Sequence, residues 1–578
     1  MFPERLRTII LALLVLALLA CKMLPVADVP VVEPSRTPFQ PLDSSQVDPE
    51  NDGAIIPGAQ NIEAKTWTLR ISDSVPAALR EQINLPEGFE IEQDGKPADL
   101  VLDVMASSGE GPESQWVYAL VGPFPTLLDE VSGEDLKRAW KGETLEFLNG
   151  RPLLMASSTE QALTRHWGPP AAEAVRAVKS DNLLEKAWEK PYSLAVVPFE
   201  RLEPRWKVIR IEGTSPLDKD FSFKKYPLRV RFGLAGEPEA LALLANNTES
   251  FIPENNRDTQ KMSVVVMTGV TALVRATGAK MESNGMSYPG EDIRHWLTEA
   301  DLTHISNEVS FDESCPPANP YQYSLQFCSR LEYLDLLDYV GMDIMELTGN
   351  HLMDWGRNAF DNSLALYEER GWKTYAAGAD LAAARQPLLI EHNGNKLAFL
   401  GCNPAGPEYV WATDNRSGVT DCADDWILEE ITHLRGEGYL PIVTLQYFES
   451  YGFIPSPSQQ RYFQSMAEAG AVIVSGSQAH HPQTMAFYED QFIHYGLGNL
   501  FFDQMRLPDG YGVPVFDVED LPVPGTRLEF VDRHIFYDGR YLGTEILTAM
   551  LEDYARPRPM TVDERKILLR NTFESSGW

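Results

Sequence analysis

Apolar runs that end in polar residues recur along the carboxy-terminal half of the chain. The pattern predicts strands in MSVVVMTGV (262–270), DLTHISNEVSF (301–311) and GMDIMELTGNHLMDWG (341–356). It recurs in KLAFLGCNP (396–404), LPIVTLQYFESY (440–451), GAVIVSGSQAHHPQ (470–483) and FIHYGLGNLFFDQ (492–504), with a helix-like NSLALYEERG at 362–371. An open α/β fold collects polar groups at its strand ends, so we expect a site there.

The amino-terminal half also alternates strand-like and helix-like segments. TWTLRIS (66–72), ADLVLDVMA (98–106) and SLAVVPFERL (193–202) are strand-like, whereas SGEDLKRAWKGE (132–143) and PPAAEAVRAVKS (169–180) are typical of helices. At 578 residues the chain is too long for one ordinary core. We therefore expect an α/β fold class with a smaller α/β domain at 63–250, a larger one at 258–550, and a carboxy-terminal tail at 551–578.

The first residues are typical of an export signal. Arg5 and Arg7 form a positive start, and an apolar stretch that is short for a membrane span follows. The end of that stretch, LLAC, resembles a bacterial lipobox, which implies a signal peptide at 1–20 and lipidation of Cys21. A plain secretory signal or an uncleaved anchor are the alternatives. Each places the body outside the cytoplasm, and the Pro-rich segment 21–62 is expected to be a tether.

The charge balance bears on partners. The chain has 49 Lys and Arg against 84 Asp and Glu, a net charge of −35. This balance argues against nucleic acid and against a generally anionic partner. Hydrophobic residues make up 44% and there are 12 Trp, so the bulk should fold into packed cores with an acidic, solvated surface.

Four cysteines remain after Cys21, namely Cys315, Cys328, Cys402 and Cys422. An even number in an exported chain permits disulfides, and four cysteines allow three pairings. Sequence neighbours are the favoured pairs, Cys315 with Cys328 and Cys402 with Cys422. Free buried thiols are the alternative. The chain contains no CxxC, which argues against a thiolate metal site.

Two stretches of the first half resemble periplasmic solute-binding proteins. They are YALVGPFPTLLDEVSGEDLKRAWKGE (118–143) and SLAVVPFERLEPRWKVIRIEG (193–213). The resemblance implies a solute-binding-like α/β domain. The alternative is an α/β spacer domain that binds no ligand.

The second half resembles the CapA-type capsule-synthesis family, which is linked to poly-γ-glutamate and is a branch of the calcineurin-like metallophosphatase fold. The residues that carry the resemblance lie between Val264 and Met505. They are TG at 268–269, Asn307-Glu308, GNHxxDxG at 349–356, Glu449, GSxxHxxQ at 476–483 and YGLGNLFFDQ at 495–504. The resemblance implies a four-layer α/β sandwich with its site at the strand ends.

The chain departs from the family at three expected metal ligands. The family has an Asp where this chain has Val270, and imidazoles where it has Gln446 and Gln478. A dinuclear site needs anionic oxygens and imidazoles, whereas these side chains are apolar or neutral. The remaining candidate ligands are Glu308, Asn350, His351, Glu449 and His480. We therefore expect a degenerate site with no certain cofactor and at most one weakly bound divalent metal ion.

Each candidate also has a purely structural interpretation. Asn350 can cap a helix, the two histidines can be hydrogen-bonded core residues, and Glu308 can pair with an arginine.

Two classes of function remain open, and the sequence does not decide whether the chain is an enzyme. The resemblance implies a membrane-anchored surface lipoprotein that serves synthesis, retention or export of an anionic capsule-like polymer. Its partners would be that polymer or its export machinery. The alternative is an active extracellular metallohydrolase that cleaves a phosphoester or a γ-glutamyl amide bond. In a third hypothesis the first domain is a solute receptor.

Overall fold

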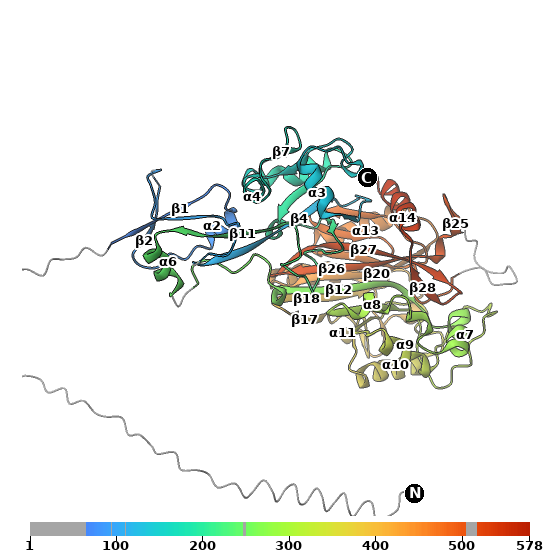
Figure 1. Ribbon diagram of the computed structural model, residues 1–578. Helices are drawn as coiled ribbons and strands as arrows, with labels where there is room; N and C mark the ends of the chain where they lie inside the picture. Colours follow the sequence, from blue (N-terminus) through green and yellow to red (C-terminus); the bar gives the residue numbers. More distant parts are fainter. Residues whose placement is uncertain (1–64, 94, 110, 247–249, 505–516) are drawn as a thin grey trace, which may run out of the picture. The chain divides into compact units, whose positions relative to one another are not determined.

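The computed structural model describes residues 65–93, 95–109, 111–246, 250–504 and 517–578 (Figure 1). The expected signal peptide, Cys21 and the tether at 21–62 lie outside these residues. The described chain from residue 65 onward belongs to one compact unit.

The first domain is built on a nine-stranded mixed sheet with the order β2-β1-β3-β11-β4-β8-β6-β7, in which β9 also pairs with β4. Its strands are β1 (Trp67–Ile71), β2 (Phe89–Ile91), β3 (Leu100–Val104), β4 (Glu113–Pro123), β6 (Leu153–Met155), β7 (Val175–Ala177), β8 (Ala195–Pro198), β9 (Trp206–Val208) and β11 (Arg229–Gly236). A separate pair joins β5 (Glu130–Val131) to β10 (Arg210–Ile211). The helices are α2 (Ala77–Glu81), α3 (Gly133–Trp140), α4 (Ser157–Trp167), α5 (Leu183–Trp188) and α6 (Pro238–Ala245), with 3-10 turns η1 (Glu146–Leu148), η2 (Ser180–Asn182) and η3 (Phe199–Arg201).

One predicted helix of this domain is wrong. Residues 169–180 contain no helix before the turn at Ser180, and Val175–Ala177 form β7, which pairs in parallel with β6. Pro169 and Pro170 supply no backbone N–H, and Glu173 has a positive φ of 65°, which a helix does not tolerate. The pairing with β6 uses the backbone groups that a helix would have bonded internally.

The second domain contains two large sheets. The seven-stranded sheet has the order β15-β14-β13-β12-β26-β27-β28, and the six-stranded sheet has the order β17-β18-β20-β21-β23-β22. The strands are β12 (Met262–Thr271), β13 (Leu302–Asn307), β14 (Ile344–Glu346), β15 (Lys373–Tyr375), β17 (Leu388–His392), β18 (Asn395–Cys402), β20 (Leu440–Ser450), β21 (Ile473–Ala479), β22 (Met485–Tyr488), β23 (Gln491–His494), β26 (Leu528–Tyr537), β27 (Arg540–Glu552) and β28 (Arg556–Pro559). Two small pairs join β16 (Ala377–Gly378) to β19 (Gly418–Val419) and β24 (Asp517–Val518) to β25 (Leu521–Pro524).

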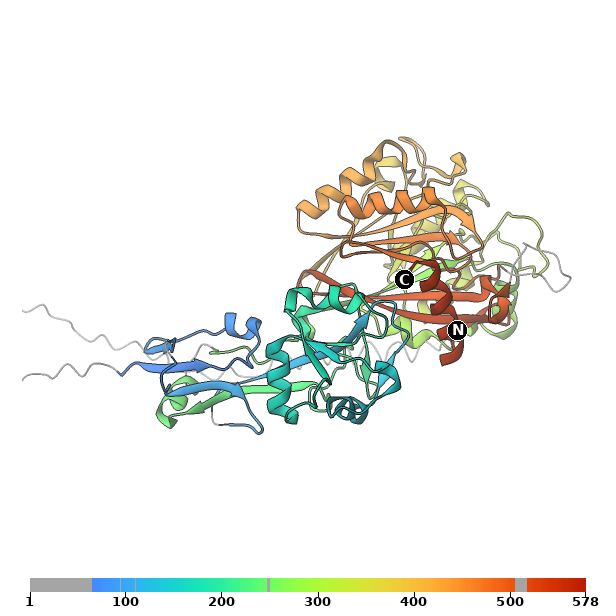
Figure 2. The same ribbon diagram turned by 90° about the horizontal axis from the view of Figure 1, so that it is seen from above.

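Helices cover the outer face of each sheet. These helices are α7 (Arg275–Asn284), α8 (Arg294–Thr298), α9 (Leu334–Tyr339), α10 (Arg357–Glu369), α11 (Leu381–Ala384), α12 (Trp426–Gly436) and α13 (Pro457–Glu468). The last helix, α14 (Val562–Ser575), instead packs into the cluster between the sheets. The 3-10 turns are η4 (Thr259–Lys261), η5 (Tyr288–Gly290), η6 (Leu331–Tyr333), η7 (Glu408–Val410), η8 (Ala423–Asp425) and η9 (Gly525–Arg527). One apolar cluster lies between the sheets, one between α7–α10 and the seven-stranded sheet, and one under α12 and α13 (Figures 1 and 2). The expected α/β fold with a four-layer second domain is confirmed.

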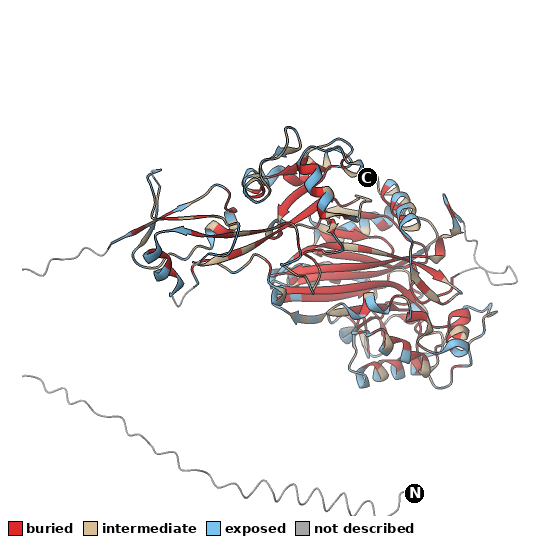
Figure 3. Ribbon diagram, viewed as in Figure 1, coloured by how far each residue is buried: buried red, intermediate tan, exposed pale blue. Residues whose placement is uncertain are grey.

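The strands that lead to the site are parallel and buried on both faces. β12, β13 and β14 run in parallel in one sheet, and β18, β20 and β21 in the other. Strands covered on both sides need near-continuous apolar runs, which is why this part of the sequence shows such runs (Figure 3). Because the strands are parallel, their carboxyl ends meet at one edge of each sheet.

Residues 551–578, which the sequence analysis set apart as a tail, continue the fold. β28 pairs with β27, and α14 begins with a capping box in which Thr561 and Glu564 bond each other's backbone N–H. Leu568, Leu569 and Phe573 of α14 are buried in the cluster between the sheets. No helix within the described residues is long and apolar enough to cross a membrane.

Candidate functional site

The ends of four parallel strands bring the expected site residues together. Glu308 follows β13, and Asn350 and His351 follow β14 from the same sheet. Gln446 and Glu449 lie in the carboxy-terminal half of β20, and Gln478 is the second-last residue of β21. His480 directly follows the end of β21. The two sheets thus each contribute side chains to one site.

The amide nitrogen of Gln446 lies at the centre of this site. It donates to Glu308 Oε1 at 3.1 Å and to Asn350 Oδ1 at 3.2 Å, and it also bonds Gln478 Oε1. Glu308 and Gln446 are almost completely buried, with 3% and 1% exposed. Three oxygen acceptors from three strand ends therefore converge on one neutral N–H₂ group, which occupies the space that their lone pairs face.

Buried hydroxyl and carboxyl groups lie next to the side-chain oxygen of Gln446. Ser477 Oγ donates to Gln446 Oε1 at 2.9 Å and lies 3.4 Å from Glu346 Oε1, which Thr348 also bonds. Burial raises the pKa of Glu346 to about 7, and the nearby charge of Glu308 adds to this increase, whereas hydrogen bonds from Ser306, Thr348 and Ser477 oppose it. Glu346 is therefore a carboxyl group that is largely protonated below neutral pH.

His351 is held by Asp354 and an aromatic ring. Its Nδ1 lies 2.6 Å from Asp354 Oδ2, and the ring centroids of His351 and Phe327 are 4.7 Å apart. Burial lowers the pKa of His351, but the hydrogen bond to Asp354 and the charges of Glu308, Asp354 and Glu449 outweigh it, so the net shift is upward.

His480 lies on the opposite side of the site, beside Glu449. Its Nδ1 contacts Asn499 Oδ1 at 2.8 Å, and its Nε2 lies 3.9 Å from Glu449 Oε1. Glu449 also accepts from the Tyr451 hydroxyl and, at 3.3 Å, from the Gln504 amide. Because Glu449 is 44% exposed and the histidine 4%, the carboxylate forms the solvent side of this group.

Val270 lies in an apolar cluster next to these polar groups. It is 1% exposed and belongs to a cluster with Val309, Phe327 and Phe502. Phe502 also contacts the His480 ring, at a centroid distance of 5.3 Å. Val270 therefore places hydrocarbon beside the polar groups, at the position where the resemblance led us to expect a carboxylate.

A close backbone approach explains one glycine of the motif that supplies Asn350 and His351. A Cβ atom on Gly349 would lie 2.6 Å from Glu308 Cα, nearer than Cβ contacts allow. The glycine lets the loops after β13 and β14 touch, and so sets Glu308 against Asn350.

Both histidines are hydrogen-bonded, as their structural interpretation expects, whereas the structural alternatives for Asn350 and Glu308 do not describe their contacts. The amino-terminal cap of α10, the helix after Asn350, is Gly356, and Asn350 instead accepts from Gln446. Glu308 accepts from the same amide. The structure also adds three residues that the sequence analysis did not place in the site, namely Asp354, Tyr451 and Gln504. Their signals were the His-x-x-Asp spacing and the alternate-residue spacing of 449 and 451 on an extended chain.

Disulfides fasten two loops near the site. Cys315 is bonded to Cys328 and Cys402 to Cys422, which are the pairs of sequence neighbours that the sequence analysis favoured. The first closes the loop that carries Phe327 against His351, and the second ties the end of β18 to the turn before α12.

The side chains fit poorly to a two-metal centre. Among the described residues, no group of three or more His, Cys, Asp and Glu side chains is placed to hold a metal ion. The site instead combines the carboxylates of Glu308 and Glu449 with three amides and with two histidines that have other partners.

Residues 264–504 match the family model described as "Bacterial capsule synthesis protein PGA_cap". The match begins in β12 and ends at Gln504, so it contains every candidate ligand. This segment therefore resembles the bacterial capsule synthesis family. The expected resemblance to the CapA-type capsule family is thereby confirmed.

Curated proteins that the chain resembles include capsule proteins from two bacilli. The chain is 24% identical over 270 residues to the capsule biosynthesis protein CapA of Bacillus anthracis, covering 46% of this chain and 65% of that protein. It is 24% identical over 202 residues to the PGA biosynthesis protein CapA of Bacillus subtilis, covering 35% and 52%. The chain thus spans between half and two thirds of the length of these relatives.

Solved structures show partial likeness to parts of the chain. A 5'-nucleotidase precursor from Thermus thermophilus has a TM-score of 0.29 and 13% identity, covering 54% of this chain and 59% of that chain. An ABC-type phosphate transport receptor from Vibrio cholerae has a TM-score of 0.23 and 12% identity, covering 26% and 75%. TM-scores this low carry no argument about ligand or activity.

Proposed function

We propose that the chain serves the synthesis, retention or export of an anionic capsule polymer of the poly-γ-glutamate type, and that the domain containing residues 264–504 does so without metal-dependent hydrolysis. The match over residues 264–504 and the two CapA relatives support the capsule pathway. The observation that favours this function over an extracellular metallohydrolase is the position of the Gln446 amide.

The amide argues against a working two-metal centre on chemical grounds. Hydrolytic metal sites need anionic oxygens that offset two cations and lower the pKa of a bound water. Here an N–H₂ group, which can donate two hydrogen bonds, lies against the oxygens of Glu308, Asn350 and Gln478, and Val270 contributes only hydrocarbon. We infer a degenerate site that holds at most one divalent ion loosely.

The charge of the site entrance favours a protein partner over the bare polymer. Glu449, which is 44% exposed, lies at this entrance on a chain with a net charge of −35, so a free polyanion would be repelled. Large apolar side chains are exposed nearby in sequence, namely Trp355 at 39%, Tyr409 at 53% and Phe448 at 59%. Exposed aromatic residues are typical of protein interfaces. We therefore favour the polymer's export machinery as the partner.

The proposed location is outside the cytoplasm on a lipid anchor at Cys21. Support comes from Arg5, Arg7 and the LLAC sequence that ends at this cysteine. Cys21→Ser should release soluble protein or leave an uncleaved precursor, and unchanged lipid labelling of that variant would contradict the anchor.

Complementation of a deletion strain tests the function. The deletion should lower surface polymer, and the wild-type gene should restore it. Glu308→Gln should also restore it, because the new amide oxygen still accepts from Gln446, whereas a metallohydrolase would lose its carboxylate ligand. Phe448→Ala should restore less polymer than Tyr192→Ala, a matched change at an equally exposed (59%) aromatic residue of the first domain. Full loss of polymer with Glu308→Gln would favour the hydrolase.

A further inference from the structure

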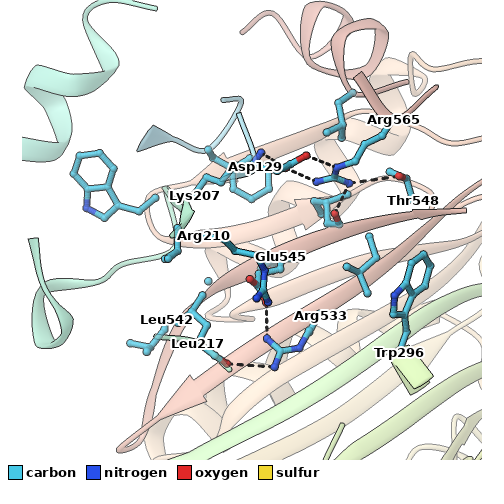
Figure 4. A pocket seen from close by; sticks show the side chains of 18 of the residues that line it. Asp129, Lys207, Arg210, Leu217, Trp296, Arg533, Leu542, Glu545, Thr548 and Arg565 are labelled. Carbon is cyan, nitrogen blue, oxygen red and sulfur yellow. Dashed lines mark hydrogen bonds and ion pairs between the residues drawn. The ribbon is translucent and has the colours of Figure 1, made fainter. Parts of the chain in front are cut away.

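A cavity of about 440 Å³ lies where the first domain meets the second (Figure 4). The first domain contributes residues of β9 and β10, and the second contributes residues of α8, β27 and α14. The volume falls within the range of small-molecule sites. The cavity shares no residue with the candidate site at the strand ends.

Much of the wall is apolar. Trp206 from the first domain and Trp296, Leu542 and Leu569 from the second line it, so it can bury the hydrocarbon part of a solute. A few charged side chains interrupt this wall, and they are not distributed evenly.

One end of the cavity carries an excess of positive charge. Lys207 Nζ donates to Thr126 O at 2.6 Å and to Asp129 Oδ1 at 2.7 Å. Arg565 holds both oxygens of the same Asp129, at 2.9 and 3.0 Å (Figure 4). Two cations therefore share one carboxylate. Among the described residues, Thr126 O and Asp129 Oδ1 are the two acceptors of Lys207 Nζ, so the third N–H of this ammonium group is available.

The charge of Lys207 is only partly compensated. Burial lowers the pKa of Lys207 to about 8, Asp129 opposes this decrease, and the positive charge of Arg565 adds to it. An added carboxylate would offset the repulsion between the two cations.

Another part of the cavity carries an excess of negative charge. Arg533 donates to Glu545 Oε2 at 2.5 Å and to Glu299 Oε1 at 2.9 Å, so two carboxylates share one guanidinium. Within the described part of the chain, the second oxygen of each carboxylate receives no hydrogen bond. Arg210 also lines the cavity, and Asp218 holds it at 2.5 and 3.0 Å. Burial lowers the pKa of Arg210, but Asp218, Glu545 and Glu299 outweigh this effect, so in this part three carboxylates act on two guanidinium groups.

We propose that this cavity binds a small zwitterion with an apolar body, of the class of free amino acids and short peptides. The carboxylate of the solute would lie against Lys207 and its ammonium group against Glu545, with the side chain on the tryptophan and leucine wall. A polyanion would place negative charge against the two glutamates. An uncharged solute would compensate neither the positive charge at Lys207 nor the negative charge at Glu545. This site goes beyond the proposed capsule function, which uses none of these residues.

Isothermal titration calorimetry of the exported chain with L-leucine, L-phenylalanine and leucyl-leucine tests the proposal. At least one of these probes should bind with one-to-one stoichiometry. The N-acetyl derivative of that probe, which lacks the ammonium group, and its amide, which lacks the carboxylate, should each bind at least tenfold more weakly.

Two variants tie the binding to the cavity. Lys207→Met keeps the aliphatic stem and removes the cation, and Glu545→Gln keeps the shape and removes the anion. Each should weaken binding at least tenfold, whereas Lys190→Met, at an exposed lysine, should not. If Lys207→Met is not folded by circular dichroism, Glu545→Gln decides. Absence of binding by all three probes, equal binding of the blocked derivatives, or binding that the folded variants do not change would overturn the proposal.

Discussion

Replacing Glu346 by Gln should make the protein less sensitive to alkaline pH. Glu346 is 1% exposed beneath the candidate site, and burial raises its pKa from 4.5 to about 7. Between these two pH values the folded protein keeps a proton that the unfolded chain has lost. By linkage, the free energy of unfolding therefore falls as the pH rises through this window.

The size of the effect follows from the two pKa values. At about 1.4 kcal/mol per pH unit, the step from 4.5 to about 7 corresponds to a loss on the order of 3 kcal/mol above pH 7. Glutamine keeps the shape of the protonated acid and carries no charge. Glu346→Gln should thus be nearly as stable as wild type at pH 4.5 and clearly more stable at pH 8.5.

Chemical denaturation of both proteins at a series of pH values measures this difference. The difference between them isolates Glu346 from Asp503, whose pKa burial also raises to about 7. Glu369→Gln, at an exposed position of α10, is the control and should show no such trend. A Glu346→Gln protein that is destabilised equally at every pH would refute the reasoning, because its role would then lie in hydrogen-bond geometry alone.

Three further changes have expected outcomes. Gly349→Ala should lower the free energy of unfolding by about 1–3 kcal/mol because its Cβ would lie 2.6 Å from Glu308 Cα. Gly436→Ala, whose Cβ would have nothing within 4 Å, should lower it less, and equal stability of the two variants would contradict the close approach. Replacing Cys402 and Cys422 together by Ser should lower the free energy of unfolding by about 2–4 kcal/mol, and recovery of both as alkylatable thiols from the native envelope would contradict the disulfide. Trp578→Ala should speed proteolysis between the domains, because Trp578 packs on Phe124 and Trp188 of the first domain at 5.7 and 6.0 Å, and unchanged cleavage would argue against that contact.

The parts of the fold that could be predicted are those with a strong local pattern. Buried parallel strands need apolar runs, so β12, β20 and β21 were evident from the sequence together with the polar groups at their ends. The segment 169–180 misled because its composition favours a helix, whereas its pairing partner β6 and the positive φ of Glu173 are not visible locally. The same holds for Asp129 and Arg565, which are 436 residues apart in sequence and form an ion pair between domains.

The candidate site was predictable where a motif carried it and not where geometry did. Glu308, Asn350 and His480 follow from the order of the strand ends. The central position of the Gln446 amide does not, because it depends on where the side chains of two sheets meet. Gln504 was missed for the same reason, since its contact with Glu449 joins a strand end to a distant loop, whereas the contact of Tyr451 with Glu449 is local.

Metal content tests the central claim most directly. The purified chain would be equilibrated with Mn²⁺, Zn²⁺ or Ca²⁺ and desalted. Mass spectrometry would then measure the bound metal, and a separate assay would measure hydrolysis of a model phosphodiester. The Gln446-centred site predicts at most one equivalent of loosely held metal and little hydrolysis. The triple variant Val270→Asp, Gln446→His and Gln478→His should bind more metal, since it adds one anionic and two imidazole ligands. Two tightly bound metal ions and phosphodiester cleavage in the wild-type chain would contradict the account.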